Sequence, residues 1–265
     1  MPVLGQGTWH MGEVPGKAKQ EIAALKLGLD LGMTLIDTAE MYGSGGAERV
    51  VGQAIAGRRD EVFLVSKVLP SNASTPGTIA ACERSLKRLG TDHIELYLLH
   101  WRGGHPLAAT CEAFQQLKEQ GKIRAFGVSN FDFDDIEELC TGDRGMPACN
   151  QILYHLNERG TEFALLPHQR TLGIATMAYS PFDEGRLLGV SALNQIAGQA
   201  GATAAQVALA WLLAQPGVCA IPKSANQQRV KENCAAAELR LSPETLDALD
   251  AAFPAPARAR PLAMI

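Results

Sequence analysis

The sequence lacks the features that would indicate a nucleic-acid partner, a membrane or a secreted location. Its formal net charge is −4, so it has no basic excess that would attract nucleic acid or an acidic membrane surface. Its most apolar run, residues 207–214, is far shorter than the ~20 residues of a membrane-spanning helix. The first residues do not resemble a signal peptide. We therefore expect a cytoplasmic protein without nucleic-acid or membrane partners.

The six cysteines form no CxxC pair and show no spacing typical of metal ligands. Cysteines of this kind are usually reduced and buried as small apolar residues. We expect free thiols and no metal site.

No stretch rich in proline, glycine or serine divides the 265 residues. The composition, 46% hydrophobic and 20% charged, is ordinary for a globular enzyme. We set no internal boundary and expect one domain over residues 1–265, because α/β barrels commonly have this length. We also expect the protein to be a monomer.

Strand-like and helix-like segments alternate eight times along the chain. The expected strands are residues 3–8, 34–36, 62–66, 94–99, 125–128, 149–152, 174–178 and 218–221. Positions 9, 37, 67, 100, 130, 151, 179 and 223 lie within two residues of their downstream ends. Five of the seven intervals measure 28 to 33 residues, close to the roughly 30 residues of a βα unit, and the other two measure 21 and 44. The pattern predicts a single-domain (β/α)8 TIM barrel; an open doubly wound sheet is the alternative, although no GxGxxG follows the first strand.

Four chemically related side chains fall near consecutive strand ends: Asp37, Tyr42, Lys67 and His100. A phenol has a reference pKa near 10, and a nearby ammonium lowers it by favouring phenolate. A carboxylate beside that ammonium keeps it charged, and a histidine can bond a substrate carbonyl oxygen. Each residue alone is more often a cap, a packing residue or a surface residue. Together they predict a site for carbonyl reduction.

Four separated motifs resemble those of the aldo-keto reductase family: GMTLIDTAEMYG at 32–43, LLHW at 98–101, GKIRAFGVSN at 121–130 and IPKS at 221–224. The resemblance covers nearly the whole chain and is closest to small bacterial members that reduce methylglyoxal and other aldehydes. It implies a (β/α)8 barrel that uses NADPH/NADP+. In this family pattern, Tyr42 donates the proton, His100 orients the carbonyl, and Asp37 and Lys67 complete the tetrad.

The same resemblance implies the cofactor contacts. Ser129, Asn130 and Gln151 would hold the nicotinamide carboxamide, and Tyr179, with Ser180 beside it, would stack on the nicotinamide ring. An amide requires paired donors and acceptors, and a flat ring favours an aromatic surface. A helix cap is the alternative interpretation of residues 129–130.

A second cofactor segment follows the eighth expected strand. The resemblance implies that Lys223, Ser224 and Arg229 bind the 2'-phosphate and that Asn233 lies near adenine. Cations at a helix N-terminus favour phosphate, so we expect NADPH rather than NADH. An exposed basic turn is the alternative.

We expect Trp9 and Trp101 to form aromatic walls of an open pocket for small carbonyl substrates. The tail, residues 254–265, is short and predicts no long extension over that pocket. The chain begins almost at its first strand, so we expect the hairpin that closes the barrel floor in the family to be absent or reduced to residues 1–2. An alternative function is a regulatory module that binds NADPH as a redox sensor and turns over slowly.

Overall fold

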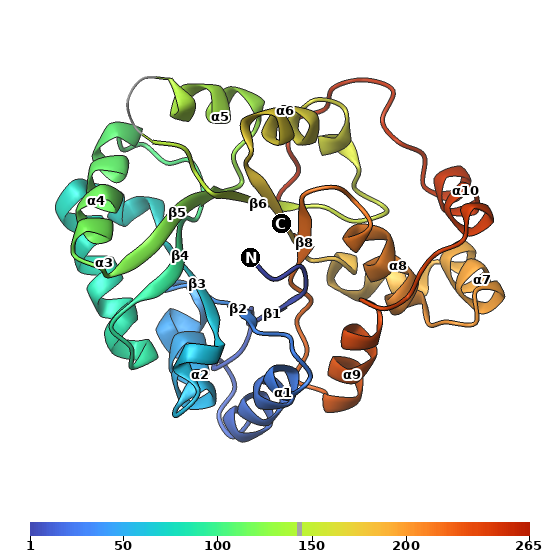
Figure 1. Ribbon diagram of the computed structural model, residues 1–265, viewed down its shortest axis with the longest axis horizontal. Helices are drawn as coiled ribbons and strands as arrows, with labels where there is room; N and C mark the ends of the chain where they lie inside the picture. Colours follow the sequence, from blue (N-terminus) through green and yellow to red (C-terminus); the bar gives the residue numbers. More distant parts are fainter. Residues whose placement is uncertain (142–144) are drawn as a thin grey trace.

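The computed structural model describes residues 1–141 and 145–265. Eight parallel strands pair in the order of the sequence, and Figure 1 shows them around a central axis with the helices outside. The strands are β1 (Gly5–Gly7), β2 (Leu35–Asp37), β3 (Phe63–Val68), β4 (Ile94–Leu99), β5 (Ile123–Ser129), β6 (Cys149–Leu153), β7 (Ala175–Tyr179) and β8 (Val218–Ala220). The consecutive order confirms the barrel prediction and shows that the doubly wound alternative was wrong.

The first and last strands meet through isolated parallel bridges. Leu4 pairs with Ala220, and Gly7 pairs with Lys223. Gly7 suits this contact because a Cβ atom there would lie only 2.7 Å from the carbonyl oxygen of Ile221. The close approach of β1 and β8 brings the loop after β1 and the loop after β8 to the same mouth of the barrel.

Ten α-helices are found in the described residues. They are α1 (Ala18–Asp30), α2 (Gly46–Ile55), α3 (Thr75–Leu89), α4 (Leu107–Glu119), α5 (Phe133–Cys140), α6 (Leu165–Leu172), α7 (Ser191–Gln199), α8 (Ala204–Leu213), α9 (Gln227–Ala235) and α10 (Pro243–Ala252). Helix α9 begins with a side-chain cap, since the Asn226 side chain accepts from the backbone N–H groups of Gln228 and Arg229 at 2.9 and 3.1 Å.

Three of these helices have little local signal in the sequence. α5 and α6 each contain eight residues, and α7 begins without a side-chain cap. Short helices show few turns of apolar periodicity, so packing against the barrel rather than local pattern stabilises them. The segment beyond Phe182 leads into helix α7 at Ser191.

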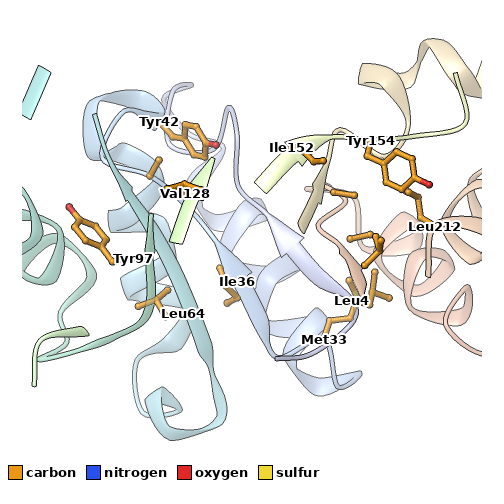
Figure 2. Packing of buried hydrophobic residues seen from close by; sticks show 14 of the residues in the cluster. Leu4, Met33, Ile36, Tyr42, Leu64, Tyr97, Val128, Ile152, Tyr154 and Leu212 are labelled. Atoms are coloured by element: carbon orange, nitrogen blue, oxygen red, sulfur yellow. The ribbon is translucent and has the colours of Figure 1, made fainter. Parts of the chain in front are cut away.

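The core has two layers that alternate along each strand. Leu35 and Val65 belong to a cluster inside the barrel, whereas Ile36 and Leu64 belong to the larger cluster between the barrel and the helices. Figure 2 shows the second layer, including Ile36, Leu64 and Tyr97. Side chains two residues apart on a strand share a face. The inward position of Leu35 therefore also turns Asp37 into the barrel.

Cys82, Cys149 and Cys219 are free and buried, and Cys111 is also buried, which confirms the prediction of mostly buried cysteines. Among the described residues, no single helix is long and apolar enough to cross a membrane. Helices α7 and α8 reach that length and composition only as a pair, and they are bent by 84° relative to each other.

Candidate active site

The four side chains predicted to act together meet at the downstream ends of β2, β3 and β4. Lys67 Nζ donates to the Asp37 carboxylate at 2.8 Å and to the Tyr42 hydroxyl at 3.1 Å. It also donates to the carbonyl oxygen of Thr38 at 3.0 Å. The rings of Tyr42 and His100 meet edge to face, with centroids 5.6 Å apart. The structure therefore brings all four predicted residues into one group.

The strand boundaries around this group differ from the expected ones. Asp37 is the last residue of β2, and Lys67 lies inside β3 rather than after it. Lys67 pairs with Leu98 of β4 and Val68 pairs with Leu99, so pairing with β4 extends β3 past the expected end at residue 66. The side chain of Lys67 consequently lies inside the barrel and is fully buried.

Burial and charge act against each other in the pKa values of this group. Burial opposes the charge of Lys67, but Asp37 and then Tyr42 outweigh it and raise the pKa of the ammonium. Burial also raises the pKa of Tyr42, and the positive charge of Lys67 compensates only in part. The expectation of a lowered phenol pKa was wrong in its net direction because the sequence does not reveal how deeply Tyr42 lies. The phenol keeps its proton at neutral pH.

His100 is held in its neutral form. Burial lowers the pKa of the imidazole to about 2, and the positive charge of Lys67 contributes in the same direction. Its Nδ1 has no hydrogen-bond partner among the described residues. A neutral imidazole facing a cavity can bond a carbonyl oxygen without competing for the proton of Tyr42.

A cavity opens above the group of four and contains most of the predicted site residues. Lys67 lies beneath its floor and supports Asp37 and Tyr42 from inside. The predicted residues that line the cavity are Trp9, Asp37, Tyr42, His100, Trp101, Ser129, Asn130, Gln151, Tyr179, Ser180 and Lys223.

The polar side chains on one wall of this cavity are already ordered by one another. The Tyr179 hydroxyl donates to Asn130 Oδ1 at 2.9 Å, and Asn130 Nδ2 donates to the carbonyl oxygen of His100 at 3.2 Å. Asn130 and Ser180 have left-handed backbone conformations, with φ of 57° and 47°. Such conformations cost energy in residues other than glycine and are often found at binding sites.

A second cavity of about 530 Å³ adjoins the first one. Lys223, Ser224, Arg229 and Asn233, the residues expected to hold the phosphate and adenine of the cofactor, line it. Trp9, Ser180, Pro181 and Lys223 line both cavities. The two cavities therefore form a continuous cleft. The amides of Asn130 and Gln151 and the ring of Tyr179 line the first cavity, and the cations Lys223 and Arg229 line the second. This donor set fits a long anionic cofactor with an amide-bearing ring.

Several lining residues were missed by the sequence analysis. Glu232 lines the second cavity beside Arg229 and Asn233, and the helical spacing of these three residues could have indicated it. Met41 and Ile265 line the first cavity. The expectation that the tail leaves the pocket uncovered needs correction, since Ile265 reaches the cavity wall. No local pattern signals that contact.

Residues 1–141 and 145–265 contain no candidate metal site. No group of three or more histidine, cysteine, aspartate or glutamate side chains there is arranged to hold an ion.

The known proteins to which this chain is similar are reductases. The chain is 50% identical over 262 residues to the methylglyoxal reductase YeaE of Escherichia coli, covering 97% of this chain and 92% of the relative. It is 37% identical over 254 residues to a glyoxal reductase of Bacillus subtilis, covering 95% and 88%. A crystal structure of an aldo/keto reductase from Klebsiella pneumoniae, in complex with NADP and acetate, superimposes with a TM-score of 0.97 at 49% identity, covering 100% and 96%.

The family comparison agrees with the geometry of the site. The model of the aldo/keto reductase family matches residues 3–253, nearly the full length of the chain. The barrel, the buried group of four and this match together show that the chain is an oxidoreductase of the aldo/keto reductase family.

Proposed function

We propose that this protein reduces small aldehydes and ketones of the methylglyoxal type to alcohols with NADPH. The observation that supports this most strongly is the buried bridge from Asp37 through Lys67 to the Tyr42 hydroxyl at the floor of the cavity. The names of the methylglyoxal and glyoxal reductases to which the chain is similar support the substrate class.

The cleft has the shape and chemistry that NADPH requires. We assign the nicotinamide end to the first cavity, where Ser129, Asn130 and Gln151 offer amide and hydroxyl partners and Tyr179 offers a ring. The phosphate end then lies in the second cavity. Lys223, Ser224 and Arg229 are suited to the 2'-phosphate there, and Asn233 to the adenine.

The protein groups contribute geometry and a proton. When bound, NADPH supplies the hydride that adds to the carbonyl carbon. His100, neutral at physiological pH, bonds the carbonyl oxygen and orients it toward Tyr42. Tyr42 gives its proton to that oxygen, and the ammonium of Lys67 at 3.1 Å stabilises the negative charge left on the phenol. Asp37 keeps Lys67 charged and oriented.

The walls of the first cavity favour small substrates. Trp9 and Trp101 are half-buried aromatic side chains, and Met41 and Ile265 add apolar surface. The cavity measures about 130 Å³, and the nicotinamide shares it. Such apolar walls suit a small aldehyde. We further propose that the enzyme acts as a cytoplasmic monomer.

The intact bridge also favours an enzyme over a redox sensor with slow turnover. A sensor requires the cofactor cleft but not a buried ammonium placed on a phenol. The two functions separate experimentally, because tight NADPH binding without oxidation by any aldehyde would support the sensor and contradict the reductase.

The test follows the loss of NADPH absorbance with methylglyoxal and a panel of aldehydes, for the wild type and Tyr42→Phe. Loss of the proton donor should lower turnover by roughly 10² to 10⁴-fold, while NADPH binding, measured by fluorescence titration, stays close to the wild-type value. Tyr97→Phe is a matched control, because Tyr97 packs against Phe114 in the layer between barrel and helices. Full turnover in Tyr42→Phe would show that another group supplies the proton.

A further inference from the structure

Gln151 contacts the buried group of four as well as the cavity. It lies in the middle of β6 and is 2% exposed. Its Nε2 donates a hydrogen bond to Asp37 Oδ1 at 2.7 Å and lies 2.9 Å from Met177 Sδ. A continuous series of contacts thus runs from Gln151 through Asp37 and Lys67 to the hydroxyl of Tyr42.

The partners of Gln151 determine which end of its amide faces inward. An ionised carboxylate only accepts hydrogen bonds, so the NH2 end must face Asp37, and the sulfur of Met177 is also an acceptor. The reversed amide would place two oxygens 2.7 Å apart in a buried site. Within the described part of the chain, no hydrogen bond reaches Gln151 Oε1. The amide oxygen is therefore available to a ligand in the cavity that Gln151 lines.

The two other polar side chains assigned to the carboxamide behave differently. Asn130 Nδ2 donates to the carbonyl oxygen of His100 and lies 3.3 Å from Ser129 Oγ. In residues 1–141 and 145–265, neither Ser129 nor Asn130 makes a hydrogen bond to Asp37. Gln151 is thus the member of the three that joins the cavity to the charged groups.

The contact with Asp37 has an electrostatic consequence for Tyr42. Asp37 raises the pKa of Tyr42, whereas Lys67 lowers it. An N–H group bonded to a carboxylate withdraws part of its negative charge, and the effect is strong where water does not screen it. Removing that N–H should expose Tyr42 to more of the negative charge of Asp37 and make the phenol a weaker acid.

We propose that Gln151 is a positioning residue that holds Asp37 through its amide N–H and leaves its amide oxygen to accept a hydrogen bond from the cofactor's carboxamide. One side chain then joins the cofactor site to the proton-donating group. The assignment of the oxygen rests on the proposed function, whereas the contact with Asp37 belongs to the cofactor-free protein.

The test measures the titration of Tyr42 in cofactor-free protein. The chain has four tyrosines, so ring carbons labelled with 13C at the hydroxyl-bearing position give few signals, and Tyr42→Phe identifies the relevant one. In Gln151→Met, which keeps the length but removes both N–H groups, the Tyr42 pKa should rise by roughly half a unit or more. The alkaline limb of the turnover profile should move by the same amount.

Ser129→Ala is the matched control. It alters the same cavity wall without touching the hydrogen bond to Asp37, so it should weaken NADPH binding and leave the Tyr42 titration unchanged. Gln151→Met should weaken NADPH binding and also shift the titration. If the methionine variant does not fold, Gln151→Leu removes the same N–H donors with a smaller apolar side chain and should shift Tyr42 in the same direction.

Three results would overturn the inference. The first is an unchanged Tyr42 titration in folded Gln151→Met. The second is an equal shift in Ser129→Ala, which would mean a general effect of the cavity wall. The third is a shifted titration with unchanged NADPH affinity, which would remove the shared role. Failure of the proposed function is separate, because it would appear as an absence of aldehyde-dependent NADPH oxidation in the wild type.

Discussion

Lys67 Nζ lies 2.8 Å from the carboxylate of Asp37, and the two side chains are only 0% and 3% exposed. A buried ion pair of this kind is not in itself a source of stability, because both charges lose their hydration. Its members nevertheless depend on each other, since removal of one leaves an uncompensated charge inside the barrel. The pair thus connects the chemistry of the site to the stability of the fold.

Replacing Lys67 with methionine should therefore destabilise the protein as well as inactivate it. The remaining carboxylate of Asp37 keeps only uncharged partners, and breaking a buried pair costs about 3–5 kcal/mol. Chemical denaturation followed by circular dichroism measures the loss. The double variant Asp37→Asn/Lys67→Met should regain most of the stability without regaining turnover. A single variant as stable as the wild type would mean that the pair is solvated in solution.

Acidification should reveal the burial of His100. The unfolded chain binds a proton at this residue below about pH 6.5, whereas in the folded protein the pKa is lowered to about 2. Stability from this group is therefore complete above pH 6.5 and falls as the pH decreases through the interval between the two values. At pH 5 the difference corresponds to about 2 kcal/mol.

The variant His100→Gln removes this contribution to the pH dependence. Its free energy of unfolding should fall between pH 7 and pH 5 by about 2 kcal/mol less than that of the wild type. His155, whose pKa is also lowered by burial, is present in both proteins and cancels in the comparison. Equal acid sensitivity of the two proteins would show that His100 is hydrated in the folded state.

The preference for NADPH should depend on Arg229. This guanidinium lines the second cavity, and a hydrogen bond to a charged group contributes about 1.5–3 kcal/mol. In Arg229→Met, the dissociation constant of NADPH should rise roughly 10-fold or more, while that of NADH changes little. Lys231→Met removes an exposed charge from the same helix and is the control. Similar losses in both variants would indicate a general charge effect rather than a phosphate contact.

Much of the site could be predicted because its residues occupy the same structural position in successive βα units. Asp37 and His100 lie at or next to the end of a buried apolar strand, and a barrel brings such ends together. The cap at Asn226 was predictable for a similar local reason, because its side chain bonds N–H groups only two and three residues further on.

The remaining features depend on contacts distant in sequence. Gln151 and Asp37 are 114 residues apart, so their hydrogen bond is set by the closure of the barrel rather than by a local pattern. The raised pKa of Tyr42 arises from burial by surrounding elements. Ile265 reaches the cavity only through the path of the tail over the barrel. Such features follow from tertiary packing, which no window of the sequence contains.

Replacing Trp101 with alanine should change the substrate range without changing the cofactor. Trp101 packs against His100 with ring centroids 5.0 Å apart and lines the first cavity, whereas Trp9 lines both cavities. An aromatic contact contributes about 0.5–1.5 kcal/mol beyond its buried area, so the KM for phenylglyoxal should rise up to roughly 10-fold. The KM for methylglyoxal, which has no ring to stack, should change less, and the NADPH dissociation constant should stay constant. Trp9→Ala should instead weaken NADPH binding as well. If Trp101→Ala leaves the KM for phenylglyoxal unchanged, Trp101 is not a wall of the substrate pocket.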